Sequence, residues 1–192
     1  MSKPIALFST AIGALALAAA LIAPVNAQDK MMKSEMSGTK TVMVGGAAMF
    51  PSKNIIQNAV NSKDHTTLVA AVKAAGLVNT LEGKGPFTVF APTNAAFGKL
   101  PAGTVDNLVK PENKATLSKI LTYHVVPGKL EASDLTDGKK LKTVEGEQLT
   151  IKKSGDKVTI IDSKGESSTV TIPNVNQSNG VIHVVDTVLM PS

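Results

Sequence analysis

The spacing of apolar residues changes once along this chain, and that change constrains the fold more than any other feature. Between residues 54 and 121 many apolar side chains recur every three or four residues, which is typical of short amphipathic helices. From residue 148 onward they mostly alternate, which is typical of strands separated by glycine-containing turns. Helices gathered early and strands gathered late predict an α+β fold. The expected strands are 87–90, 148–153, 157–161, 168–172 and 181–189.

Two patterns predict where strands lie in the sheet. The last expected strand carries apolar residues on both faces: Val181, His183, Val185 and Leu189 on one, and Ile182, Val184 and Val188 on the other. A strand that is covered on both faces belongs near the centre of a sheet. The run Lys139-Lys140-Leu141-Lys142 is instead typical of an exposed edge guarded by lysine.

The first 27 residues are typical of a secretory signal peptide. Lys3 precedes an almost wholly apolar run from Ile5 to Ala23, Pro24 follows, and Val25-Asn26-Ala27 forms a small-x-small cleavage site. The alternative, a transmembrane anchor, is disfavoured by that proline and cleavage site. No later apolar run has spanning length, so we expect a secreted or periplasmic protein without membrane insertion after cleavage.

After cleavage, 192 − 27 = 165 residues remain, enough for one domain. Residues 28–51 are polar and methionine-rich, which predicts a flexible linker, and residues 52–192 form the expected folded domain. The chain has no cysteine, so its core must hold without disulfides.

The positive charge of the chain does not predict nucleic-acid binding. All 20 basic residues are lysine, and the planar arginine fork that reads phosphates and base edges is absent. Aromatic residues for base stacking make up only 3% of the chain. We therefore interpret the scattered lysines as a solvated surface.

Three stretches, in this order, resemble the fasciclin (FAS1) domain family. They are 87-FTVFAPTNAAFGKL-100, 119-KILTYHVVPGKL-130 and 179-NGVIHVVDTVLMP-191. The resemblance covers about residues 52–192 and is closest to secreted single-domain bacterial members. It implies a β-sandwich-like wedge with several short helices packed on it. It also implies extracellular adhesion or protein interaction, and not catalysis.

The pair Tyr123-His124 could serve structure, partner recognition or chemistry. Apolar neighbours surround His124 in either a helix or a strand, and a buried imidazole needs a hydrogen-bond partner. The resemblance implies that His124 is a structural anchor tied to the first motif, with Thr93 or Asn94 as its partner, and His183 is a further structural motif residue. It also makes Tyr123 and His124 candidates for partner binding.

Motifs for catalysis are missing from the sequence: it contains no G-x-S-x-G elbow, no H-E-x-x-H and no glycine-rich phosphate loop. We therefore expect a non-enzymatic adhesion module without a cofactor, a monomer or weak oligomer, that binds a protein or glycan at the cell surface or in the envelope.

The alternative function is copper binding by the linker, because thioethers are soft ligands that select Cu(I). Met31, Met32 and Met36 are the candidate ligands. If this is right, changing all three to leucine abolishes Cu(I) binding by the mature protein in a competitive titration. An affinity that the triple variant leaves unchanged removes the hypothesis.

Overall fold

The computed structural model describes residues 41–192. Its helices are α2 (Ile55–Ala59), α3 (Thr66–Ala75), α4 (Val78–Glu82), α5 (Asn94–Gly98), α6 (Thr104–Leu108) and α7 (Lys114–Tyr123), with 3₁₀ turns η1 (Lys63–His65) and η2 (Pro111–Asn113). Its strands are β1 (Val42–Val44), β2 (Ala47–Met49), β3 (Phe87–Pro92), β4 (Val125–Pro127), β5 (Lys140–Lys142), β6 (Gln148–Ser154), β7 (Lys157–Ile161), β8 (Ser167–Gln177) and β9 (Gly180–Val185). The predicted α+β class is confirmed. None of the described helices has the length and apolar character needed to cross a membrane.

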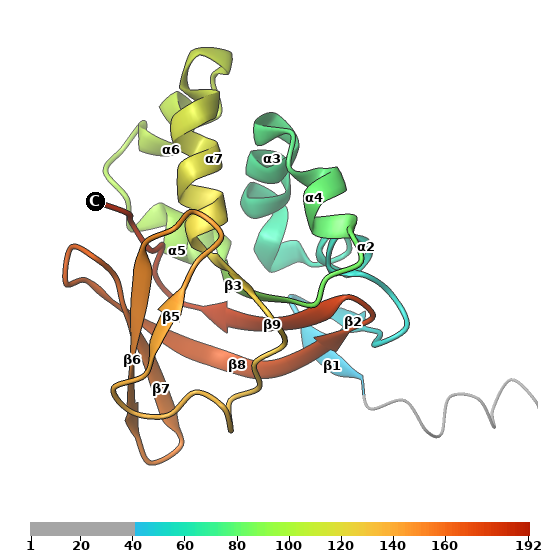
Figure 1. The fold of residues 1–192 in the computed structure, drawn as a ribbon. Coiled ribbons are helices and arrows are strands. Elements are labelled where there is room, and N and C mark those ends of the chain that lie inside the picture. The colour runs from blue at the N-terminus through green and yellow to red at the C-terminus, as the bar shows by residue number, and fades with distance from the viewer. Residues whose placement is uncertain (1–40) are drawn as a thin grey trace, which may run out of the picture. The chain divides into compact units, whose positions relative to one another are not determined.

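Seven strands form one sheet in the order β4-β3-β9-β8-β7-β6-β5. The β3–β9 pair is parallel and the other pairs are antiparallel. A hydrogen bond from the Val144 N–H to the Val125 carbonyl, 2.8 Å long, joins the two ends of this order, so the sheet is nearly closed. Figure 1 shows β5, β6 and β7 running across the direction of β8 and β9, while helices α3, α4 and α7 lie together on the side of β3.

Strand β9 lies between β3 and β8, and all six of its residues are buried, as its two apolar faces predicted. It ends at Val185, four residues earlier than expected. Strand β5 lies at the edge of the sheet, where Lys140 and Lys142 are exposed and Leu141 is buried. The lysine-guarded edge is therefore confirmed.

Two apolar clusters lie against the sheet. The helix-side core joins the helices to β3 and β9 and includes Leu68, Val72, Leu117, Leu121, Val89, Ile182 and Val184. The strand-side core fills the curve of β5 to β7 and includes Phe90, Tyr123, Leu135, Leu149, Ile151, Ile160, Val185 and Leu189. Alternate residues of β3 and β9 belong to different cores, so these two central strands separate them.

The flexible linker was predicted to reach residue 51, and the structure corrects this boundary. Strands β1 and β2 form a hairpin whose turn is Gly45-Gly46, both with positive φ. Val44 and Met49 are each 3% exposed and belong to the helix-side core. Residues 42–49 are apolar apart from the two glycines, unlike the polar residues before them, and burial of Val44 and Met49 compensates the entropy of ordering the hairpin. The predicted signal peptide and residues 28–40 lie outside the described residues.

Candidate functional site

His124 connects all three sequence motifs. It follows α7 as its C-cap residue and is 2% exposed. Its Nδ1 lies 2.8 Å from the Ile120 carbonyl oxygen, and its Nε2 accepts a 3.0 Å hydrogen bond from the Leu189 N–H. These two partners assign the proton to Nδ1 in a neutral ring. The backbone carbonyl of His124 also accepts a bond of 2.9 Å from the Phe90 N–H.

The expected partners of His124 were wrong. The Thr93 hydroxyl accepts a hydrogen bond from the Ala96 N–H, 3.2 Å long, and caps α5. The Asn94 side chain accepts from the Thr67 N–H at 3.0 Å. Both side chains accept hydrogen bonds from free N–H groups at helix starts, and neither bonds to the imidazole of His124. The first motif is tied to His124 through backbone, and the side chain of His124 is tied to the third motif.

Tyr123 is fully buried, with 0% of its surface exposed, so its side chain cannot make a direct contact with a partner. Its hydroxyl oxygen accepts a 2.9 Å bond from the Ser163 N–H and lies 3.2 Å from the Ser163 hydroxyl. Burial raises the pKa of Tyr123, and the Ser163 hydrogen bonds oppose that shift. The side chains of Tyr123 and His124 point into different cores. Tyr123 packs in the strand-side core, whereas His124 lies against helix-side residues. The burial of both side chains removes the predicted direct contact.

His183 is fully buried in β9. Its Nε2 lies 2.8 Å from the Leu130 carbonyl oxygen, and its ring stacks on Phe90 with centroids 5.7 Å apart. A longer bond of 3.4 Å from the Asn174 N–H reaches Nδ1. The ring therefore connects the loop after β4 to the bent strand β8, which is a structural role.

His124 and His183 are poorly suited to acid–base or metal chemistry. Burial lowers the pKa of His124 from 6.5 to about 4, more than the Ile120 carbonyl and the Asp162 carboxylate raise it. Burial likewise lowers the pKa of His183. Both nitrogens of each ring already have partners. Within residues 41–192 no group of three or more His, Cys, Asp or Glu side chains could hold a metal ion. Met31, Met32 and Met36 lie outside the described residues.

Strands β5, β6 and β7 place four exposed lysines on one outer face of the sheet. Direct cross-strand pairs are Lys140 with Thr150, Lys142 with Gln148, Lys152 with Thr159, and Ser154 with Lys157. Directly paired residues point to the same side, and alternate residues along a strand share a face. We call the set Lys140, Lys142, Lys152 and Lys157 the lysine face.

This face carries no carboxylate of its own strands. Its remaining positions on β5 to β7 are Gln148, Thr150, Ser154, Thr159 and Ile161. The ion pairs found in the described part of the chain use other lysines, namely Lys99, Lys119 and Lys129. Lys140 and Lys142 were predicted to guard an edge strand, whereas Lys152 and Lys157 were interpreted as part of a scattered, solvated surface. Strand register brings the four lysines to one face. The alternation of apolar and polar residues and the turn at 154–156 were the sequence signals for this arrangement.

Comparison with known proteins identifies relatives over most of the chain. The sequence model described as "Fasciclin domain" matches residues 63–191. Protein sll1483 of Synechocystis is 50% identical over 159 residues, covering 82% of this chain and 85% of that protein. The "Cell surface glycolipoprotein MPB83" of Mycobacterium bovis is 39% identical over 153 residues, covering 77% of this chain and 64% of the relative.

A solved structure shares the fold. It is the FAS1 domain pair from the insect cell adhesion molecule Fasciclin I, with a TM-score of 0.65 and 18% sequence identity. The match covers 78% of this chain and 57% of that one. The predicted fold, strands combined with several short packed helices in the FAS1 arrangement, is confirmed, and the sheet is a nearly closed one of seven strands.

Replacing His124 with alanine should lower the free energy of unfolding by about 4 kcal/mol, because it removes a buried ring and leaves the Leu189 N–H unpaired. Urea unfolding measures this. Thr93→Ala is the matched control, and should cost about 1 kcal/mol as a lost helix cap. The two effects should add in the double variant. A loss within about 0.5 kcal/mol for His124→Ala contradicts the structural role.

Stability should also depend on pH through His124. The folded ring has a pKa of about 4 and the unfolded one about 6.5, so only the unfolded state gains a proton between these values. The contribution of the neutral His124 ring to the free energy of unfolding is fully present above pH 6.5. It declines by on the order of 3 kcal/mol as the pH falls to 4. Burial lowers the pKa of His65 and His183 too, which adds in the same direction.

Urea unfolding of the wild type and His124→Gln between pH 7 and pH 4.5 tests this dependence. We expect the free energy of unfolding to fall less steeply with decreasing pH in His124→Gln than in the wild type. Equal slopes would assign the effect to other groups.

Proposed function

The chain belongs to the fasciclin family, and we propose that it is an extracytoplasmic, non-enzymatic adhesion module that binds an acidic protein or glycan through its lysine face. The observation that carries the proposal is the alignment of four exposed lysines on one carboxylate-free sheet surface.

The lysine face has the geometry of a recognition surface for a polyanion. Lys140 and Lys142 are two residues apart on β5, and alternate residues of a strand are spaced by about 7 Å. Lys152 and Lys157 extend the positive charge along β6 and β7. Threonine, serine and glutamine side chains between them offer hydrogen bonds. Because the strands hold these backbone positions rigidly, an acidic partner meets a fixed array of charges.

The setting and the absence of catalysis have separate support. Members of this family are in general non-catalytic adhesion modules. The relative named a cell surface glycolipoprotein, together with the sequence of residues 1–27, supports a place outside the cytoplasm. In the described part of the chain, the motif residues His124, His183 and Tyr123 are buried and bonded. They shape the domain, and the binding surface is elsewhere.

Neutralising the lysine face should weaken binding to an acidic partner. The variant is Lys140→Gln, Lys142→Gln, Lys152→Gln and Lys157→Gln combined. The matched control replaces four exposed lysines on the helix side, Lys73, Lys84, Lys110 and Lys114, so both variants lose the same charge. The probes are alginate, which is a polyuronate, and native envelope fragments. Binding to each probe is measured as a function of salt concentration.

We expect the face variant to bind about tenfold more weakly, with a smaller salt dependence, because each exposed ion pair contributes up to about 1 kcal/mol. The control variant should bind like the wild type. If the two variants weaken binding equally, attraction depends on net charge and the lysine face is not the site.

A further inference from the structure

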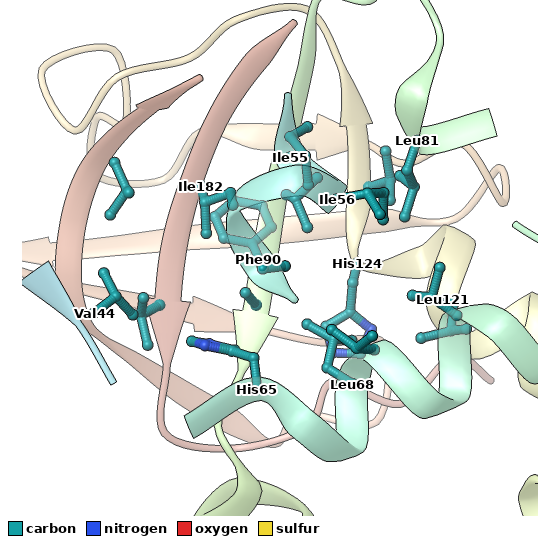
Figure 2. A pocket seen from close by; sticks show the side chains of 18 of the residues that line it. Val44, Ile55, Ile56, His65, Leu68, Leu81, Phe90, Leu121, His124 and Ile182 are labelled. Atoms are coloured by element: carbon teal, nitrogen blue, oxygen red, sulfur yellow. The ribbon is translucent and has the colours of Figure 1, made fainter. Parts of the chain in front are cut away.

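A small cavity lies inside the helix-side core. Its volume is about 40 Å³, several times the roughly 10–15 Å³ needed for one water molecule. It is bounded by the β1–β2 hairpin, α2, α3, β3 and β9, and Figure 2 shows side chains from these elements converging on it. The lining includes Val44, Met49, Ile55, Leu68, Val72 and Ile182.

One polar atom in this lining lacks a partner. His65 is 3% exposed, and its Nδ1 lies 2.9 Å from the Ser62 hydroxyl oxygen. Its Nε2 is buried and forms no hydrogen bond of acceptable geometry within the described residues, although the Ala91 carbonyl lies near enough to the ring to raise its pKa. The other histidine of the lining, His124, has both nitrogens bonded. A buried polar atom without a partner is unfavourable in a folded protein and requires an explanation.

Water explains this atom poorly. A buried water molecule is held by two to four polar partners, and the lining supplies one open nitrogen among aliphatic and aromatic side chains. A ligand that is mostly apolar and bears a single polar group fits the same lining better, because it fills the apolar space and bonds to Nε2.

We propose that this cavity binds a short aliphatic molecule bearing one hydroxyl group, with the hydroxyl on His65 Nε2 and the chain against the apolar lining. A hydroxyl both donates and accepts, so it satisfies either tautomer of the ring. A carboxylate would favour a charged ring, and burial opposes this by lowering the pKa of His65, although the Ala91 carbonyl and Asp64 raise it in part.

The β1–β2 hairpin provides a route into the cavity. Val44 and Met49 close the cavity from this hairpin, which is a two-stranded sheet separate from the seven-stranded one. Two-stranded hairpins have little stability of their own, and such elements open more readily than a central sheet. Local opening of residues 42–49 can therefore admit a ligand while β3 and β9 stay paired.

The test is a titration of the full chain with 1-butanol, followed by methyl resonances in NMR spectra. Xenon, which enters apolar cavities without hydrogen bonding, is the matched apolar probe. We expect saturable shifts at Val44, Leu68 and Ile182, and competition between the two probes. In His65→Leu, 1-butanol should bind about tenfold more weakly, as expected for one lost hydrogen bond, while xenon binding stays nearly unchanged.

A second variant keeps the test decisive if His65→Leu fails to fold. Val69 lines the cavity from a half-buried position on α3, and Val69→Phe should fill the space and remove binding of both probes. Shifts that rise linearly without saturation, or that occur only at exposed residues, overturn the proposal. So does an equal loss of both probes in folded His65→Leu, or a cavity that holds water which 1-butanol does not displace.

Discussion

The parallel pairing of β3 with β9 is the constraint on which the rest of the structure depends. It joins Phe87–Pro92 to Gly180–Val185, segments from the helical and the strand-rich parts of the chain. The approach is so close that a Cβ on Gly180 would overlap the backbone of Phe87. Because alternate residues of these two strands belong to different cores, the pair forms both cores at once. The FAS1 motifs at 87–100 and 179–191 therefore each contain one strand of this pair.

Buried polar groups fix this pairing in a single register. His124 bonds to Leu189, His183 bonds to Leu130, and Asn179 accepts from the Ile55 N–H while donating to the Leu81 and Gly83 carbonyls. Each bond satisfies a backbone group at a helix end or in a loop, where no ladder or helix partner is present. Any other register would leave several of these groups unpaired, which is more costly than the bonds are favourable. Tyr123 and His124, which stood out in the sequence, thus have structural roles.

The bend of the sheet determines where the lysine face lies. Strand β8 pairs with β7 through its first residues and with β9 through its later ones, with register shifts between Val170 and Val175. That bend turns β5 to β7 across the central strands (Figure 1). Their apolar side faces the strand-side core, and their exposed lysines lie on the opposite side. On the other side, the β1–β2 hairpin and the helices close over the central strands but leave the cavity at His65.

Because periodicity and turn residues are local properties, the sequence predicted the fold class, five of the nine described strands and the lysine-guarded edge. It also predicted a covered central strand at 181–189, which ends at Val185 in the structure. Long-range packing, by contrast, makes Leu189 the partner of His124, buries Tyr123 and brings Val44 and Met49 of residues 42–49 into the core. Each of these depends on groups distant in sequence, and packing chose among local alternatives of similar energy. For the same reason, the gathering of the lysines and the open nitrogen of His65 became visible only once the strands were in register.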